Sequence, residues 1–286
     1  MHLMMQPATE RYLALVYHGH NQWWRYLASV VIILLFAEVL GSVPLLVLRQ
    51  FYDYSGMRAF LAANLGALFQ LAGVVIAVVL IHQRRMLSLI TPHAHFDWRR
   101  AAHGFAVWFV LGAAGCLVES LLFPGRYRLS FNPETFFVFA AVALCLTPLQ
   151  TTTEELLFRG YLMQALGLFA KRPAAIAIAS SVIFMLPHLA NPEVAHDPLL
   201  VPPQYLVIGL LLAAVTLRDG RLELAIGIHA ANNLFIGLIA NYDDSVITTD
   251  AIFTAAYDPA YSLVSLIVAS VAAYWVLFGR RNSNDS

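Results

Sequence analysis

The sequence predicts an all-α membrane protein with about eight transmembrane helices. The chain of 286 residues is 60% hydrophobic and 12% charged, with a mean hydropathy of +0.70. Soluble domains carry about twice that share of charged residues. Charged and turn residues divide the chain into eight apolar stretches, most of them near the roughly 20 residues that cross a hydrocarbon core as a helix. Arginine and lysine gather in alternate connections between these stretches, as expected for a polytopic protein.

The eight expected spans follow one another with short connections. Their ranges are 27–48, 60–81, 102–123, 135–169, 174–190, 204–217, 222–240 and 261–279. The fourth is too long for one straight crossing, so it must kink, tilt or project into water, and Pro148 is the expected bend because proline removes a helical hydrogen bond. We expect a single transmembrane domain over 27–279.

The segments outside this domain are short. Residues 1–26 form a cytoplasmic N-terminal segment whose tyrosines and tryptophans suit an interfacial helix. Residues 280–286 form a cytoplasmic tail. The formal net charge of zero argues against nucleic acid as a partner, because phosphate binding needs a basic surface.

The basic residues predict the orientation of the spans. The expected cytoplasmic segments hold 12 of the 17 lysines and arginines, whereas the expected external loops hold four. The external loops 191–203 and 241–260 contain none. By the positive-inside rule both termini are cytoplasmic. We therefore expect an integral protein of a bacterial inner membrane, in contact with the lipid bilayer.

Three charged residues interrupt the fourth span. A carboxylate at membrane depth costs roughly 2.5 to 3.5 kcal/mol on insertion scales, so Glu154 and Glu155 need a reason to be there. Glu155 and Arg159 are four apart with the acid first, the favourable order for a helical ion pair, and we expect this pair to be structural. Glu154 lies about 100° around the helix, without a local counter-ion, and is free to stay protonated or to act as a base.

Two further motifs occupy the fifth and seventh spans. Phe184 and His188 form one pair, and His229 and Asn233 form the other. Each pair is separated by four residues, so both members share one helix face. We expect Phe184 to pack. We expect Asn232 to be a polar group at a helix contact, one that could exchange roles with its neighbour if the helix is rotated.

A hairpin argument brings two motifs to one depth. If the fourth and fifth spans turn at Lys171, Glu154 and His188 each lie 17 residues from the turn. Antiparallel helices place such residues at equal height. The third motif, His229 and Asn233 in the seventh span, reaches the same depth if the segment 160–172 projects past the membrane surface. The sequence thus predicts a polar active-site cavity in the second half, nearer the cytoplasmic face.

A carboxylate, two imidazoles and a carboxamide can hydrolyse an amide without a covalent intermediate. Glu154, alone or with His188, would take a proton from the attacking water. His229 and Asn233 can donate to the tetrahedral oxyanion. No serine or cysteine lies within the motifs. Zinc stays open as a cofactor, with Glu154, His188 and His229 as the ligands it would use, although the helical His-Glu-x-x-His spacing is absent and no cofactor is favoured.

The ordered set of motifs resembles the CPBP family. This family comprises the CAAX-processing endopeptidases and their bacteriocin-processing relatives, also called the Abi family, and the resemblance covers about 135–240. It implies an intramembrane endopeptidase acting on a peptide or protein presented at the membrane. It also implies that Glu154 activates water with His188, while His229 and Asn233 form the oxyanion hole. The family is often labelled metalloprotease, yet its residues favour a metal-free glutamate mechanism.

Two other functions stay open on the sequence alone. A catalytically silent membrane scaffold, such as a bacteriocin-immunity type of protein, could keep the same residues for stability. A proton-coupled transporter could use Glu154, Glu155 and His188 as a relay. Transporters usually carry paired interrupted helices in two halves, and here the polar residues lie in the second half, so this function ranks last. Glu38, alone in the first span, is expected to face the bundle with a hydrogen-bond partner.

Overall fold

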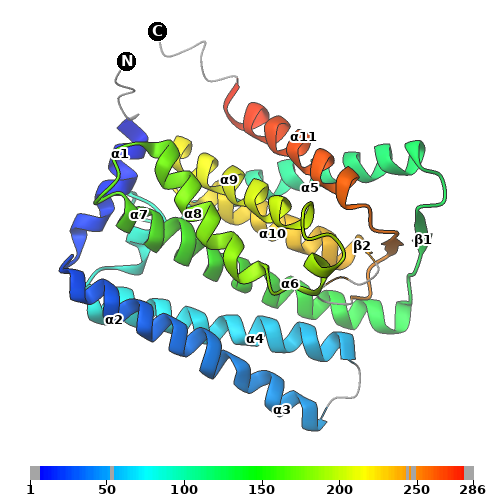
Figure 1. Ribbon diagram of the computed structural model, residues 1–286, viewed down its shortest axis with the longest axis horizontal. Helices are drawn as coiled ribbons and strands as arrows, with labels where there is room; N and C mark the ends of the chain where they lie inside the picture. The colour runs from blue at the N-terminus through cyan, green and yellow to red at the C-terminus, as the bar shows by residue number, and fades with distance from the viewer. Residues whose placement is uncertain (1–6, 52–54, 243–244, 246–248, 280–286) are drawn as a thin grey trace.

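The computed structural model describes residues 7–51, 55–242, 245 and 249–279. The predicted tail 280–286, the first six residues of the predicted N-terminal segment and the acidic residues Asp243 and Asp244 lie outside the described residues. Eight apolar helical segments occupy the places of the eight predicted spans (Figure 1). The all-α polytopic fold class is confirmed.

These segments are helices joined by loops of very different length. They are α2 (Trp23–Leu34), which continues through short π and 3-10 turns into α3 (Val43–Phe51), α4 (Ser55–Val75), α5 (Trp98–Leu122), α6 (Pro133–Glu155), α8 (Pro173–His188), α9 (Val201–Asp219), α10 (Glu223–Leu238) and α11 (Pro259–Phe278). Within the described residues, six helices are long and apolar enough to cross a membrane. The other two, α8 and α10, have 16 residues each, or about 24 Å.

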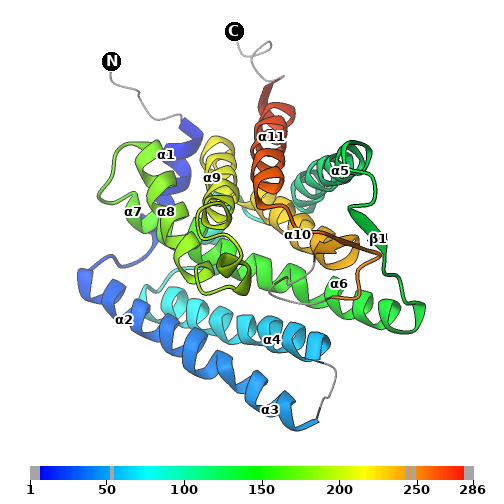
Figure 2. The same ribbon diagram turned by 45° about the vertical axis from the view of Figure 1, so that its right-hand side comes forward.

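The bundle is built around α10. Of its 16 residues, 12 are buried, more than a helix with one exposed face would allow. It packs against α5, α6 and α9, and α8 packs on α9. Helix α4 lies along α6, and α2 with α3 forms the outer edge of the molecule on that side (Figure 2). The central position of α10 explains why its motif can meet residues from several helices.

Helices α5 and α10 approach each other at backbone distance. A Cβ added to Gly227 would lie 1.9 Å from the carbonyl oxygen of Ala101, and one added to Gly104 would lie 2.3 Å from that of Leu224. Neither position has room for a side chain. Small residues allow such close contacts between membrane helices, and this contact sets the rotation of α10 within the bundle.

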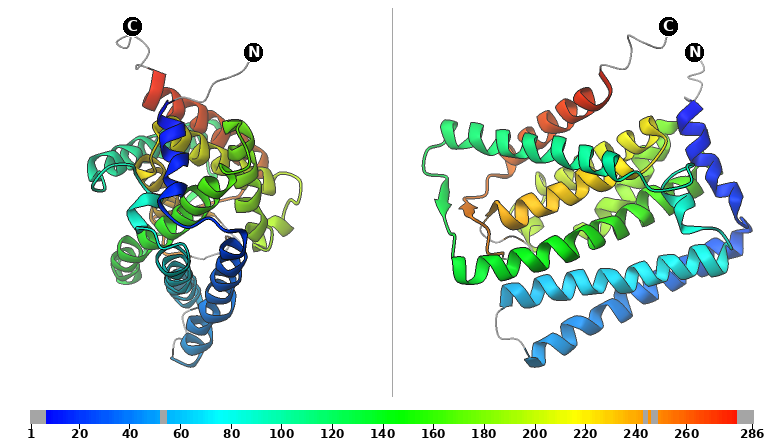
Figure 3. Two further views of the ribbon diagram at one scale, coloured as in Figure 1. Left: turned by 90° about the vertical axis from the view of Figure 1, so that its left-hand side faces the viewer. Right: turned by 180° about the vertical axis from the view of Figure 1, so that it is seen from behind.

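The loops gather at two opposite ends. At one end, α1 (Pro7–Ala14) packs on the loop after α4 and on the end of α9, with Tyr12 donating to Leu89 and Thr9 donating to Leu217, both at 2.7 Å. At the other end, the strands β1 (Tyr127–Leu129), β3 (Phe253–Ala255) and β2 (Ala240–Tyr242) form a small sheet in that order. β1 is antiparallel to β3, and β2 is parallel to it. Helix α1 and the C-terminal end of α11 lie at the same end (Figure 3).

The fourth span is one continuous helical stretch, and its irregular turn comes after Pro148. Helix α6 runs through Pro148 without ending, and the chain leaves α geometry later, in the π turn η6 (Leu156–Leu162), before α7 (Met163–Leu166). Neighbouring helices make proline tolerable inside membrane helices. The whole stretch Pro133–Leu166 has 34 residues, about 51 Å, so it must tilt or project beyond a 30 Å core.

The expected inward position of Glu38 was wrong. Glu38 lies exposed on the π turn η2 (Leu35–Val39), and its side chain makes no hydrogen bond or ion pair within the described chain. The inward face is taken by Ile33, which is buried, and by Phe36, whose Cβ would lie 2.9 Å from a Cβ on Gly73. With that face closed by tight packing, the carboxylate points outward.

Candidate active site

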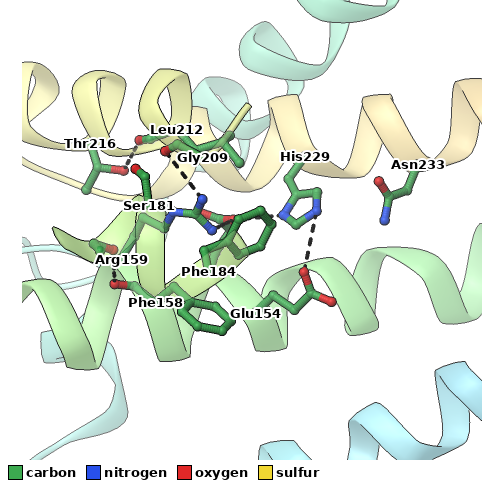
Figure 4. A network of polar contacts seen from close by, with 12 residues as sticks. Glu154, Phe158, Arg159, Ser181, Phe184, Gly209, Leu212, Thr216, His229 and Asn233 are labelled. Atoms are coloured by element: carbon green, nitrogen blue, oxygen red, sulfur yellow. Dashed lines mark hydrogen bonds and ion pairs between the residues drawn. The ribbon is translucent and has the colours of Figure 1, made fainter. Parts of the chain in front are cut away.

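The predicted site residues come from three helices. Glu154 and Glu155 end α6, and Arg159 lies in the π turn that follows. His229 and Asn233 lie on one face of α10 (Figure 4). Phe184 and His188 come from the last part of α8. The contact of α6 with α10 brings the first two groups together.

The π turn around Arg159 is held by side chains from elsewhere in the chain. A π turn turns some carbonyls away from the regular helical hydrogen bonds, and such turns are frequent at functional sites. Ser180 of α8 donates to the Phe158 carbonyl at 2.9 Å, and the Tyr12 hydroxyl of α1, whose hydrogen is shared with the Leu89 carbonyl, lies 3.0 Å from the Arg159 carbonyl oxygen. The irregular turn is therefore built in by tertiary contacts.

The predicted ion pair is present and fully buried. Arg159 Nη1 lies 2.8 Å from Glu155 Oε1, and both side chains have 0% exposure. The guanidinium also donates to the Gly209 carbonyl at 3.4 Å, and its carbon lies 4.2 Å from the centre of the Phe184 ring. A buried pair needs such additional contacts to offset the loss of water.

Glu155 has a second partner that the sequence did not indicate. Its Oε1 lies 2.7 Å from Nδ1 of His229. Because this oxygen also accepts from Arg159, the proton of the new hydrogen bond is on the imidazole, and Nδ1 donates. The ring of His229 is thereby fixed in orientation, as a carboxylate fixes the histidine of a hydrolytic triad.

The other nitrogen of His229 faces Glu154. Nε2 lies 3.7 Å from Glu154 Oε2, and the Glu154 side chain is 17% exposed whereas Glu155 is fully buried. Figure 4 shows the two groups pointing toward each other. Of the two adjacent carboxylates, Glu154 is thus the one that water can reach.

A chain of hydrogen bonds ends at Glu154. Trp108 of α5 donates to Asn232 Oδ1 at 3.2 Å, Asn232 donates to Asn233 Oδ1 at 3.1 Å, and Asn233 donates to Gln150 Oε1 at 3.3 Å. Gln150 donates in turn to Glu154 Oε1. Every donor points in the same direction, and the last acceptor is the carboxylate. Such chains polarise each member toward the acceptor.

His188 is the predicted residue that the structure does not bring to the carboxylate. Its Nδ1 lies 2.8 Å from the Phe184 carbonyl, and its ring packs against that of Tyr205, with 4.6 Å between centroids and 35° between the ring planes. Within the described chain it makes no hydrogen bond or ion pair with Glu154. Phe184, which is buried, lies next to both imidazoles, at 4.6 Å from His188 and 6.1 Å from His229. The helix therefore presents His188 beside the site, separated from it by a packing residue.

Comparison with known proteins places this geometry in a family. Residues 133–235 match the family described as type II CAAX prenyl endopeptidase Rce1-like. A relative, the uncharacterized protein YyaK of Bacillus subtilis (strain 168), is 32% identical over 245 residues, which cover 80% of this chain and 81% of the relative. The chain belongs to the Rce1-like family. No solved structure matches it.

The Rce1-like region contains every residue of the predicted catalytic set. Glu154, His188, His229 and Asn233 all lie inside 133–235, as does Gln150. Trp108, at the far end of the hydrogen-bond chain, lies outside it. The family match and the geometry thus identify the same part of the molecule.

The residues considered for zinc do not converge on one point in the structure of this Rce1-like protein. Within the described residues, no group of three or more His, Cys, Asp or Glu side chains is arranged to hold a metal ion. His188 Nδ1 is engaged by the Phe184 carbonyl, and both nitrogens of His229 face carboxylates. Metal-binding histidines commonly donate one ring N–H to a carbonyl or carboxylate and bind the metal through the other nitrogen, so these bonds by themselves do not decide the question of zinc.

Two contacts of the candidate site were not predicted from the sequence, that of Gln150 with Glu154 and that of Glu155 with His229. Gln150 has a signal that could have found it, because it is a polar residue in an apolar span, four positions before Glu154 and therefore on the same face. The bond between Glu155 and His229 has no such signal, because it joins residues 74 positions apart on two helices.

Proposed function

We propose that this protein is an intramembrane endopeptidase that hydrolyses a peptide bond with water activated by Glu154. The observation that carries the proposal is the position of His229 between two carboxylates, 3.7 Å from Glu154 and 2.7 Å from Glu155. Membership of the Rce1-like family supports the same class of reaction. The substrate is a peptide or protein presented at the membrane.

The proposed reaction requires one protonation state of the four charged groups. Glu155 and Arg159 are paired and cancel. With Glu154 ionised and His229 protonated on both nitrogens the whole group is neutral, so this state leaves no unpaired charge in the low-dielectric site, as does the state in which the proton sits on Glu154. In that state His229 Nε2 is a donor, and Glu154 is a carboxylate able to accept a proton.

The reaction follows from these donors and acceptors. Glu154 takes one proton from water as the water oxygen bonds to the carbonyl carbon of the peptide. The carbonyl oxygen becomes an oxyanion, which accepts from His229 Nε2 and from the second N–H of the Asn233 amide. The C–N bond then breaks, and the proton on Glu154 passes to the leaving nitrogen. The products are an acid and an amine, and the scheme uses no metal.

In this scheme His188 contacts the attacking water when substrate is bound. Its Nδ1 is occupied by the Phe184 carbonyl, while its Nε2 has no hydrogen-bond partner in the described part of the chain. Catalytic contacts often tighten only when substrate is bound, so a hydrogen bond between His188 and the attacking water is compatible with its present position. We assign it that role.

The site lies closer to the α1 end of the bundle. Glu154 is 12 residues before Leu166, where the helical stretch ends, and 21 residues after Pro133, where it begins. At 1.5 Å per residue these are about 18 and 32 Å. If the α1 end is cytoplasmic, as the basic residues predict, cleavage takes place near the cytoplasmic face.

The proposal is tested by cleavage of a peptide library. Purified protein in nanodiscs is incubated with the library, and products are identified by mass spectrometry. Glu154→Gln should abolish cleavage because an amide cannot take a proton from water, while circular dichroism and size in detergent stay unchanged. Glu38→Gln is the matched control, since it removes another carboxylate from a membrane span, and it should retain activity.

Three results would contradict the proposal. One is more than a few per cent of activity in Glu154→Gln, which would remove the base. Another is an equal loss in Glu38→Gln, which would show that any change of charge in the membrane inactivates the protein. The third is a parent protein that cleaves nothing in the library or in membrane-protein extracts, which would favour the silent scaffold.

A further inference from the structure

A cavity of about 220 Å³ lies between α5, α10 and α11, next to Asn232 (the three helices are seen together in Figure 2). Its wall includes Trp108 and Glu119, which are 11 positions apart on α5. At 1.5 Å per residue the cavity therefore extends about 16 Å along this helix. It is long and narrow, and it is larger than the roughly 150 Å³ apolar cavity that is known to hold benzene.

The charged side chains of the wall are already paired. Glu119 accepts from Arg126 at 2.9 Å and from the Tyr127 hydroxyl at 2.5 Å. Asp258 accepts from Arg126 at 3.0 Å and from the backbone N–H of Tyr261 at 3.0 Å. These two contacts hold the pKa of the Asp258 carboxyl below its usual range. A charged ligand would find no unpaired charge among these wall residues, which argues against a ligand held by its charge.

The two ends of the cavity differ in chemistry. The end near the small sheet carries Tyr127, Tyr257 and Tyr261 together with the ion pairs. Tyrosine is enriched where a membrane meets water. The opposite end is formed by Trp108, which is 6% exposed, and by Phe235, which is 7% exposed. An occupant with an apolar tail and a polar head matches this polarity.

The outer faces of the two neighbouring helices are apolar and exposed. On α5 they include Leu117 and Leu121, and on α11 they include Val264 and Val268. In a membrane such faces contact acyl chains, so lipid is the amphipathic molecule that surrounds these helices. We propose that this cavity binds the acyl chain of a membrane lipid, with the head at the sheet end and the tail against Trp108.

The bound chain would touch the hydrogen-bond chain of the site. Trp108 and Asn232 line the cavity, and they are the first two members of the series that ends at Glu154. A tail packed on the indole limits its motion, and with it the motion of the amides that follow. This second consequence rests on the proposed roles of Asn233 and Glu154, whereas the binding of lipid does not.

Trp108 is a natural reporter for the occupant. In a variant with Phe at the other four tryptophans (Trp23, Trp24, Trp98 and Trp275), all fluorescence comes from Trp108. The protein is placed in nanodiscs whose lipids carry bromine on the acyl chain, because bromine quenches an indole that it contacts. We expect loss of most of the Trp108 emission relative to nanodiscs of unbrominated lipid.

Filling the cavity provides the decisive comparison. Gly115 lines it, and a Cβ there meets only Ser265 Oγ, at 3.4 Å, so Gly115→Leu places its side chain in the cavity. This change should restore most of the emission in brominated lipid. Ala114→Leu, at an exposed neighbouring position, should leave the quenching unchanged. Ser265→Leu fills the same space from α11 and serves if Gly115→Leu does not fold.

Three outcomes would overturn the lipid assignment. The first two are the absence of quenching in the parent and equal quenching after the cavity is filled. The third is displacement of the brominated chain by stoichiometric peptide substrate, which would show that the cavity binds the substrate. The first two need no substrate and none needs turnover, so failure of the proposed function leaves the comparison of quenching before and after filling intact. The link to the site is measured separately. Asn232→Leu should leave the quenching unchanged and lower kcat. An unchanged kcat would show that the cavity and Glu154 are not coupled.

Discussion

Glu155 holds two partners with one oxygen, Arg159 at 2.8 Å and His229 at 2.7 Å. Its other oxygen, Oε2, is buried and has no hydrogen-bond partner among the described residues, as is the case for Arg159 Nε. A pair selected only for stability would be expected to satisfy these atoms. The bond to His229 indicates that Glu155 orients the imidazole as well as the helix.

Removing the charge of Glu155 should destabilise the protein. Glu155→Gln leaves Arg159 buried without its counter-ion, at a cost of about 3 to 5 kcal/mol in the free energy of unfolding. The double variant Glu155→Met with Arg159→Met should recover most of that loss, because no buried charge is left unpaired, yet it should stay inactive because His229 loses its acceptor. Denaturant and thermal unfolding in detergent measure the first effect. A loss below about 1 kcal/mol, or an active double variant, would contradict this account.

Asn233 is expected to act on the transition state. Asn233→Ala removes one proposed donor and should lower kcat by about 10² to 10³, with a smaller change in KM. Asn233→Asp should be at least as damaging, because it presents an acceptor to a developing negative charge. Steady-state kinetics on the best library peptide separate the two constants. If both variants change only KM, Asn233 binds substrate instead.

At the scale of helices, the site depends on how α10 is rotated against its neighbours. The backbone of α5 touches Gly227, two positions before His229, so α10 has little freedom to turn there. On the other side, the π turn η6 places Arg159 under Phe184. Together these two contacts decide which carboxylate each nitrogen of His229 meets.

The contact of α5 with α10 gives a matched test on one helix. Gly227→Ala adds a Cβ that would lie 1.9 Å from a backbone oxygen, so the helices must separate. We expect a lower midpoint of thermal unfolding and loss of activity, because His229 moves with the backbone. Gly237→Ala, where nothing lies within 4 Å of the added Cβ, should be neutral or stabilising by up to about 1 kcal/mol. Equal effects of the two changes would show that the contact does not hold α10 in place.

At the scale of the molecule, the loops sort to two ends in the pattern predicted from charge. Arg100 pairs with Asp219, and His82 contacts His20, so connections predicted to be cytoplasmic lie together. The strands β1, β2 and β3 join two connections predicted to be external. Successive crossings of the bundle place consecutive connections at alternate ends. Which end faces the cytoplasm remains a prediction from the basic residues.

Thiol labelling in intact cells tests that orientation. In a background without Cys116 and Cys145, a cysteine is placed at Phe169 or at Leu199, which are 85% and 83% exposed and belong to opposite ends. A membrane-impermeant reagent should label Leu199→Cys in whole cells and Phe169→Cys only after the cells are opened. Both positions are equally accessible, so the difference reports the side of the membrane. The reverse pattern would invert the topology.

The sequence by itself determined the number and place of the membrane helices and the pair of Glu155 with Arg159. Both are local properties, since the length of an apolar stretch and a spacing of four residues can be read along one segment. The tertiary structure alone decided that His229 binds Glu155, that Gln150 joins Asn233 to Glu154, and that His188 Nδ1 bonds to the Phe184 carbonyl. These contacts depend on the relative rotation of α6, α8 and α10. That rotation is set by the π turn and by backbone contact at Gly227, which no pattern within one helix reveals.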